Sequence, residues 1–192
     1  MVLLSLTLEP HQVSSLPPEF AKCLDMLGTE SGVEQNLKGP ITNCVKFGSE
    51  LATAEKQILY ILATNDDENS PSQSPTPTPT PTPQSPGPWL TSFHPVSFIK
   101  TGLKHLYLLN PDNKLVERDP LCILDFYVGA SHQRKGFGKC IFDIMVASNK
   151  NGNPEKFAYD RPSKKMYPFL AKQYGLREFI EQSNNYVVFT NR

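Results

Sequence analysis

A short basic loop that contains two glycines is the part of this sequence whose residue types and spacing most clearly predict chemistry. Residues 133–139 read QRKGFGK and follow the apolar run Leu121–Val128 and a Gly-Ala-Ser turn. An apolar-periodic helix begins directly after them. The unpaired N–H groups at a helix N-terminus attract anions, and Gly136 and Gly138 let a phosphate approach the backbone closely. The loop therefore predicts a phosphate-binding site, to which its three basic side chains add positive charge.

The spacing within this loop separates it from two common phosphate-binding motifs. The sequence here lacks the Gly-x-x-x-x-Gly-Lys-Ser/Thr of the P-loop and the Gly-x-Gly-x-x-Gly of dinucleotide-binding domains. Gln/Arg-x-x-Gly-x-Gly after a strand instead resembles the pyrophosphate loop of the GNAT superfamily of N-acetyltransferases, which bind acetyl-CoA. A basic glycine turn is often only a turn, so its position between a strand and a helix is what supports this interpretation.

Five segments of the C-terminal half narrow the resemblance to one family. From about Phe98 to Phe189 the chain closely resembles the α-tubulin N-acetyltransferase family, a divergent GNAT branch, and residues 34–37, 40–42 and 60–62 resemble it more weakly. The resemblance implies acetyl-CoA as co-substrate and a lysine of α-tubulin in microtubules as acceptor. The segments are CILDFYV at 122–128, QRKGFGK at 133–139, YDRPSKK at 159–165, FLAKQYGL at 169–176 and NNYVVF at 184–189.

Acetyl transfer to a lysine needs a group that accepts the proton of the amine. The pKa of a free lysine is near 10.4, so only about one in a thousand is neutral at neutral pH. Asp160 ends a short predicted strand and matches the catalytic aspartate of the family, which implies that it accepts this proton. Two alternatives are that Asp160 pairs with Arg161 or caps the next helix, although Ser163 can supply that cap itself.

Two further residues match catalytic positions of the family. The resemblance implies that Cys122 assists in proton handling, but a cysteine in an apolar strand usually behaves as a small hydrophobic residue. Gln35 matches a glutamine that supports catalysis, whereas its local sequence shows only a polar residue after a helix. The mechanism that these matches imply is direct attack of the amine in a ternary complex, with Asp160 as base and an oxyanion stabilised near Val128.

The resemblance also implies where acetyl-CoA binds. The backbone of residues 126–128 should face the pantetheine arm, the loop should hold the pyrophosphate, and the helix after Asp160 should supply further polar contacts. An equally simple interpretation of the lysines on that helix is a solvated face. The predicted cofactor-binding residues are Phe126, Tyr127, Val128, Gln133, Arg134, Lys135, Gly136, Phe137, Gly138, Lys139, Ser163 and Lys172.

Asp125 is the charged residue of the apolar run. If the run forms a central strand, an unpaired aspartate there is costly to bury. We therefore expect Asp125 to pair with a basic residue or to lie at the acceptor cleft, and we assign it no catalytic role.

The composition excludes several classes of protein. Nineteen basic and nineteen acidic residues give a formal net charge of +0, which argues against nucleic-acid binding. No apolar run reaches the roughly 18–20 residues that cross a membrane. The four cysteines show no metal-ligand spacing, so we expect reduced thiols and no metal. We expect a cytoplasmic monomer on microtubules, with the ciliary axoneme as a candidate location.

The order of the predicted elements indicates an α+β GNAT fold, in which helices flank a mixed sheet. We expect one hairpin to turn at Gly102 and one helix to stop at Gly28. The predicted strands are the N-terminal run at 1–10, Gln57–Ala63, Phe93–Thr101, Leu103–Leu109, Leu121–Val128 at the centre, Phe157–Asp160 and Tyr186–Thr190. The predicted helices are Pro18–Gly28, Gly136–Asn149 and Ser163–Tyr174.

A proline-rich segment interrupts this pattern. Residues 65–88 hold eight of the eighteen prolines, and alternating Pro and Thr form neither a helix nor a strand ladder. We predict a disordered insertion at about 65–88 within one domain of residues 1–192, because long surface loops cost little entropy. The alternative is a linker between two domains, for which residues 1–64 are few. A spacer is the simpler role for the insertion, and a ligand for proline-binding domains is the other.

Two departures from the family favour rival functions. Pro168 lies within the predicted helix Ser163–Tyr174, where it would cost roughly 3 kcal/mol unless the helix starts late or kinks. The family usually continues beyond the position where this chain stops. A weakly active or inactive paralogue that interacts with microtubules is therefore one alternative, and a GNAT acetyltransferase for small amines is the other.

Overall fold

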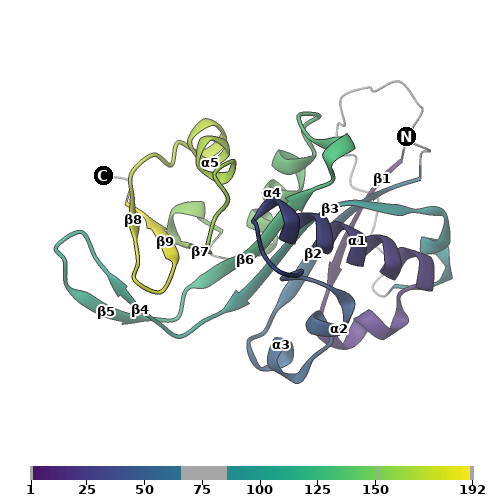
Figure 1. Cartoon of the computed structure of the whole chain (residues 1–192), viewed down its shortest axis with the longest axis horizontal. Coiled ribbons are helices and arrows are strands. Elements are labelled where there is room, and N and C mark those ends of the chain that lie inside the picture. Colours follow the sequence, from purple (N-terminus) through teal and green to yellow (C-terminus); the bar gives the residue numbers. More distant parts are fainter. Residues whose placement is uncertain (1, 66–85, 151, 191–192) are drawn as a thin grey trace.

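The fold is described here from a computed structural model, which covers residues 2–65, 86–150 and 152–190. A seven-stranded mixed sheet of order β1-β2-β3-β6-β7-β9-β8 forms its centre, beside a separate hairpin of β4 and β5 (Figure 1). The strands are β1 (Leu3–Leu8), β2 (Ile58–Thr64), β3 (His94–Leu103), β4 (Leu106–Leu109), β5 (Leu115–Arg118), β6 (Leu121–Val128), β7 (Ala158–Asp160), β8 (Phe179–Glu181) and β9 (Tyr186–Phe189). The α-helices are α1 (Pro18–Glu34), α2 (Cys44–Phe47), α3 (Glu50–Ala54), α4 (Phe137–Ser148) and α5 (Met166–Tyr174).

The alternation of side chains along β2 shows how the two faces of the sheet are covered. Leu59 and Ile61 pack in one buried cluster with α1 and β1, whereas Tyr60 and Leu62 pack in another with α4. Successive residues of a strand point to opposite faces, so α1 and α4 cover opposite faces of the sheet. This arrangement confirms the predicted α+β class.

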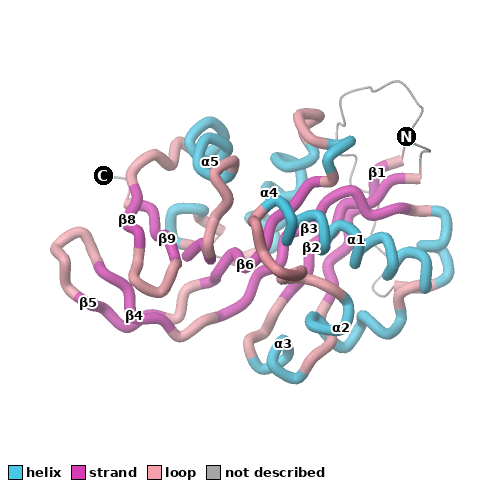
Figure 2. The backbone as a smooth tube through the Cα atoms, in the orientation of Figure 1, coloured by secondary structure: helices cyan, strands magenta, loops and turns pink. Residues whose placement is uncertain are grey.

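Most of the predicted elements are present. β6 has the predicted bounds and lies between β3 and β7, and α4 connects it to the parallel strand β7. The N-terminal run forms β1, the edge strand. Figure 2 shows the helices and strands on the backbone trace. The short strands β5 and β8 were not predicted, because their four- and three-residue lengths give too little apolar alternation.

The prediction that the first helix stops at Gly28 is wrong, since α1 continues to Glu34. A Cβ atom on Gly28 would lie 1.9 Å from the carbonyl oxygen of Thr42, and one on Gly32 would lie 2.9 Å from that of Gly39. Both glycines therefore allow the segment 39–43 to lie directly against the helix. A close approach of backbone, and not a helix end, explains these glycines.

The predicted hairpin through Gly102 is also wrong. β3 runs through Gly102 to Leu103 and pairs with β2 and β6, and β4 pairs with β5 instead. Which strands form a hairpin depends on pairing between segments that are distant in the chain. The local sequence around Gly102 does not show that pairing. The hairpin of β4 and β5 projects from the end of the sheet (Figures 1 and 2). Gln182 holds β4 by hydrogen bonds to both the N–H and the C=O of Leu109, at 2.6 and 3.2 Å.

The predicted insertion at 65–88 falls mostly on residues 66–85, outside the residues that the structure describes. The two strands that it connects are antiparallel neighbours, with Thr64 opposite His94. Among the helices of the described residues, none is long and apolar enough to cross a membrane.

Candidate active site

The strands β6 and β7 separate after a short parallel contact. They pair only at Cys122 with Ala158 and Ile123 with Tyr159, because β7 ends at Asp160 while β6 continues to Val128. Beyond Ile123, β6 pairs with β3 alone among the described strands. The other edge of residues 126–128 therefore presents backbone groups that a ligand rich in amides can bind, apart from the carbonyl oxygen of Val128, which accepts from the side chain of Gln133.

A cleft of about 500 Å³ opens beside this edge. It is bounded by the end of α1, the edge of β6, the loop before α4, and α5 with the residues that precede it. Its lining residues are Ser31, Glu34, Gln35, Phe126, Tyr127, Val128, Gln133, Arg134, Gly136, Gly138, Lys139, Ser163, Lys165, Met166, Pro168, Phe169, Lys172 and Gln173.

The loop before α4 connects the end of β6 to the first turn of the helix. The side-chain amide of Gln133 donates to the carbonyl oxygen of Val128 at 3.0 Å and so folds the loop back on β6. Gly136 has φ of 89°, which favours glycine, and stands directly before the first turn of α4. No described residue forms an ion pair with Arg134, so its guanidinium remains available to an anion. Lys139 instead pairs with Asp143 at 2.5 Å.

Ten of the twelve predicted cofactor-binding residues line this cleft, and two do not. Phe137 is 2% exposed and packs in the core on the α4 side of the sheet, so only its backbone remains for a ligand. Lys135 is exposed, outside the lining.

The position at which α5 begins explains how this helix accommodates Pro168. α5 starts at Met166, three residues later than predicted, so Pro168 is its third residue. The first four N–H groups of a helix have no partner within it, and Lys164, four residues before, lies outside the helix. Proline at this position therefore neither breaks nor kinks α5. The expectation that Ser163 caps the helix is wrong, because Lys165 holds the cap position without a side-chain cap.

An extra residue in β6 determines which side chains share a face. Lys100 pairs with Asp125 and Thr101 with Ile123, so Leu124 has no partner in the register and forms a bulge. Residues three apart in a regular strand point to opposite faces, but one inserted residue restores a common face. Cys122 and Asp125 thus both point to the face that α1 covers.

Cys122 lies in a small group of ionisable side chains, the Cys122 cluster, made of Glu55, Lys104, Cys122, Asp160 and Tyr186. Burial raises the pKa of the Cys122 thiol to about 12; the nearby charge of Lys104 acts against this shift and that of Asp160 adds to it. Burial and the charge of Asp160 likewise raise the pKa of Tyr186. The thiol therefore remains protonated at neutral pH.

Asp160 is the last residue of β7 and pairs with its neighbour. The Nε and Nη2 atoms of Arg161 donate to the two carboxylate oxygens at 2.9 and 3.1 Å. This is the salt bridge that the sequence left as an alternative to catalysis. The side chain of Arg161 is 51% exposed and that of Asp160 is 14% exposed, so the arginine covers the carboxylate from the solvent side.

The three predicted catalytic residues are not all on the cleft. Gln35 lines it, whereas Asp160 and Cys122 lie outside its lining, in the Cys122 cluster. Gln35 is the residue that ends α1, and its side-chain amide donates to Ser31 Oγ at 3.1 Å and to Asp125 Oδ1 at 3.3 Å.

Several residues that line the cleft were not predicted, and the wrongly predicted end of the first helix explains some of these omissions. Ser31 and Glu34 share a face with Gln35 only if α1 continues past Gly28, so the predicted stop hid Ser31 and Glu34. Helical spacing from Leu24 through Leu27 to Ser31 was the available signal. For the missed α5 residues, Met166 and Phe169, the apolar spacing indicated a core and gave no separate signal for a site.

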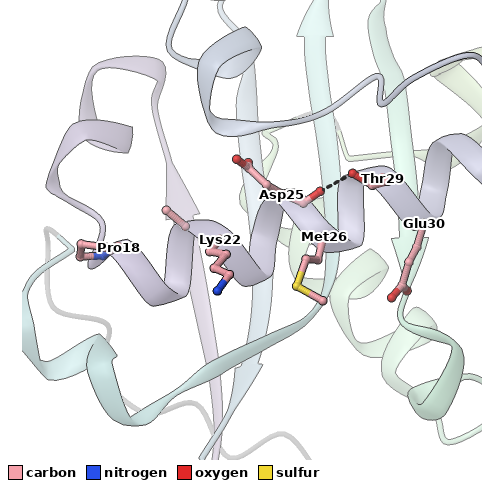
Figure 3. Close-up of a pocket in the computed structure, with 7 residues that line it drawn as sticks. Pro18, Lys22, Asp25, Met26, Thr29 and Glu30 are labelled. Atoms are coloured by element: carbon pink, nitrogen blue, oxygen red, sulfur yellow. Dashed lines mark hydrogen bonds between the residues drawn. The ribbon is translucent and has the colours of Figure 1, made fainter.

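A second hollow, of about 620 Å³, is larger but a weaker candidate. All seven lining residues come from α1, so a single helix forms the lining (Figure 3). Its one polar contact in the view is the hydrogen bond from Thr29 Oγ1 to the carbonyl oxygen of Asp25, at 2.9 Å. None of the residues predicted for catalysis or cofactor binding lines it. Within the described part of the chain, no cluster of three or more His, Cys, Asp or Glu side chains could hold a metal ion.

Solved structures of the same fold define the class of protein. The protein AAC(6')-Iy, solved with a bisubstrate analogue, matches the whole chain with a TM-score of 0.52 and 12% identity, and it is itself covered over 99% of its length. A mutant of the toxin AtaT matches 99% of the chain with a TM-score of 0.51, at 93% coverage of its own length and 11% identity. The fold is therefore that of the GNAT acetyltransferases.

Sequence comparison narrows the class to a family. The profile of the family described as "GNAT acetyltransferase, Mec-17" matches residues 90–191, more than half of the chain. A protein of Phytophthora infestans named alpha-tubulin N-acetyltransferase is 35% identical over 90% of this chain and 88% of its own length. Alpha-tubulin N-acetyltransferase 1 of Danio rerio is 36% identical over 90% of this chain, which spans 49% of that relative. The chain belongs to the Mec-17 family of acetyltransferases.

Proposed function

We propose that this chain transfers an acetyl group from acetyl-CoA to a lysine of α-tubulin in cytoplasmic microtubules. The observation that carries the proposal is the cleft beside the edge of β6 that β7 leaves unpaired, with the loop before α4 as one of its walls. The names of the Phytophthora infestans and Danio rerio relatives supply the acceptor. AAC(6')-Iy, which shares the fold, holds a bisubstrate analogue that contains CoA.

The lining of the cleft fits acetyl-CoA in three respects. The free edge of residues 126–128 offers hydrogen bonds to the amides of pantetheine. The start of α4, with Gly136 before it, offers unpaired N–H groups to the pyrophosphate. Arg134, with Lys172 on the opposite wall, adds positive charge. Acetyl-CoA would supply the acetyl group as a thioester.

Asp160 is the residue that we assign as proton acceptor. A lysine amine must lose a proton before it attacks, and Asp160 supplies a carboxylate at the end of β7, where this strand stops pairing with β6. Arg161 occupies both oxygens of this carboxylate in the structure. Because the arginine side chain is half exposed, it can turn into solvent when a lysine arrives.

The state of Cys122 supports direct transfer to the amine. A thiol is a weak nucleophile until it loses its proton, and burial raises the pKa of Cys122 to about 12. We therefore assign Cys122 a supporting role, with no acetylated intermediate. Acetylated protein formed with acetyl-CoA alone at Cys122 would contradict this assignment.

The test is acetylation of α-tubulin in polymerised microtubules by the purified protein with labelled acetyl-CoA. Asp160→Asn removes the base and keeps the size of the side chain, so we expect the rate to fall by about 100-fold or more. The matched control is Glu19→Gln, which neutralises a carboxylate at the N-terminal end of α1, and we expect its rate to be unchanged.

Each result leads to a different conclusion. Loss of activity in Asp160→Asn alone supports both the acceptor and the base. Full activity in Asp160→Asn keeps α-tubulin as substrate and removes Asp160 as base. If the folded wild-type protein leaves tubulin unmodified but acetylates polyamines, the acceptor is a small amine.

A further inference from the structure

A buried carboxylate connects α1, the segment 39–43 and β6. Asp125 is 4% exposed, and each of its oxygens accepts a hydrogen bond from a hydroxyl. Ser31 Oγ donates to Oδ1 at 2.7 Å, and Thr42 Oγ1 donates to Oδ2 at 2.6 Å. The mechanism proposed above gives this carboxylate no role, although it lies directly behind Gln35.

Lys100 completes the surroundings of Asp125. The two residues are register partners in β3 and β6. Burial raises the pKa of Asp125, whereas the hydrogen bonds from Thr42 and Ser31 and the charge of Lys100 act against this rise. Its Nζ donates to the carbonyl oxygen of Ile41 at 2.9 Å. Lys100 and Thr42 together hold the segment 39–43 against the sheet, which Gly28 and Gly32 make possible by admitting it beside α1.

The hydrogen bonds around Gln35 determine which way its amide points. Both oxygens of Asp125 accept hydrogen bonds from hydroxyls, and Ser31 spends its own proton on Asp125. Both neighbours of the Gln35 side chain are therefore acceptors. The NH₂ group must face them, at 3.1 Å from Ser31 Oγ and 3.3 Å from Asp125 Oδ1. The carbonyl end of the amide is left without a partner in this network.

We infer that Asp125 is a positioning residue that fixes the Gln35 amide with its NH₂ group inward, so that its oxygen is presented to the cleft as a hydrogen-bond acceptor. Gln35 lines that cleft. The group that such an oxygen recognises is an N–H donor, and in this reaction the donor is the amine of the incoming lysine. This inference rests on the proposed function for the identity of the donor, and on the hydrogen bonds alone for the orientation.

Asp125→Asn would remove this control over the orientation of the Gln35 amide. The amide of the asparagine donates as well as accepts, so the Gln35 side chain could turn over and present NH₂ to the cleft. We expect Asp125→Asn to lower kcat by about tenfold or more, with the KM for acetyl-CoA changed less than about twofold. Because the effect passes through Gln35, the double variant with Gln35→Ala should be no slower than Gln35→Ala alone.

A rescue separates positioning from a purely structural role. Gln35→Glu on its own places two carboxylates together and should be slow. Combined with Asp125→Asn, however, the glutamate accepts from the asparagine NH₂ and presents an acceptor oxygen to the cleft again. We expect this combination to recover at least about a third of the kcat that Asp125→Asn loses. A structural defect at position 125 would not be repaired by a change at position 35.

Two threonines provide a matched pair of controls. Thr42→Val removes a hydroxyl that binds Asp125 and should lower kcat, with the same non-additivity toward Gln35→Ala. Thr101→Val removes a hydroxyl that is equally buried but has no hydrogen-bond partner among the described residues, and it should leave kcat unchanged. Independent, multiplicative losses in the double variants, or failure of the rescue, would overturn the inference.

If the proposed function is wrong, the orientation of Gln35 can still be tested through protein stability. If the wild-type protein acetylates no tubulin, the same double-mutant cycle is measured in the free energy of unfolding. A coupling between Asp125 and Gln35 that is absent between Thr101 and Gln35 then supports the orientation without the reaction. The absence of any coupling overturns it.

Discussion

At the scale of single residues, one inserted residue in β6 arranges the chemistry of this protein. Leu124 has no partner in the register with β3, and this bulge turns Cys122 and Asp125 to the same face of the sheet. Cys122 then joins Asp160 in a cluster of ionisable groups, while Asp125 contacts Ser31 and Thr42. A regular strand would have divided these side chains between two faces.

The buried thiol of Cys122 predicts how the stability of the protein depends on pH. Its pKa is about 12 in the folded protein against an ordinary value of 9.0, so the unfolded chain loses the thiol proton first as the pH rises. The stability that this group contributes is complete below pH 9.0 and is lost between there and about pH 12.

We therefore expect the free energy of unfolding of the wild-type protein to fall relative to that of Cys122→Ala between about pH 8 and about pH 10. Urea unfolding at a series of pH values measures the difference, which cancels the titration of all other groups to first order. A difference that stays constant over this range would show that Cys122 is not shielded from solvent.

At the scale of elements, the late start of α5 removes an apparent conflict in the sequence. The residues before Met166 form an irregular segment in which the N–H of Met166 donates to the carbonyl oxygen of Ser163 at 2.8 Å. Pro168 consequently lies in the first turn and also lines the cleft. The proline that favoured a weakly active or inactive paralogue is thus compatible with an intact helix beside the cleft.

Pro168→Ala tests this placement. We expect the free energy of unfolding to change by less than about 1 kcal/mol, because no hydrogen bond within α5 is gained and the unfolded chain only becomes slightly freer. Ala171→Pro is the matched control, since this position lies in the interior of the same helix. It should cost about 3 kcal/mol or more. Equal effects of the two changes in chemical denaturation would place the start of α5 elsewhere.

At the scale of the whole molecule, α1 and α4 cover opposite faces of one sheet, and both helices and the sheet contribute to the cleft. The strands that flank the proline-rich segment are adjacent and antiparallel, with Thr64 opposite His94. The N-terminal strands β1 and β2 therefore belong to the same sheet as β6 and β7. This supports our proposal that residues 1–192 form one domain with an insertion.

Replacement of residues 66–85 by a short Gly-Ser linker tests the domain proposal. Because loop length enters the closure entropy only logarithmically, we expect the melting temperature to change by less than about 4 °C and acetylation to be retained. Loss of cooperative unfolding would instead show that the segment contributes to the fold. Lost acetylation with intact folding would give the segment a role in acceptor binding.

The sequence by itself determined the elements that hold the cleft. An apolar strand, a glycine-containing basic loop and an apolar-periodic helix are local patterns, and β6, α4 and the lining residues of the loop followed from them. The other predicted lining residues, 126–128, Ser163 and Lys172, came from the family resemblance. The family was likewise readable from short segments such as CILDFYV and YDRPSKK, and the comparisons confirm it.

The remaining features of the fold and of the site depend on contacts between groups that are far apart in the chain. Only the tertiary structure therefore decided them. Gly28 looked like a helix stop, and only the carbonyl oxygen of Thr42 beside it shows that the glycine admits another segment. Gly102 looked like a turn residue, but it lies within β3, opposite Cys122 of β6. The orientation of Gln35 depends on Asp125, ninety residues away, since a hydrogen bond is fixed by which atoms meet and a local pattern does not record that.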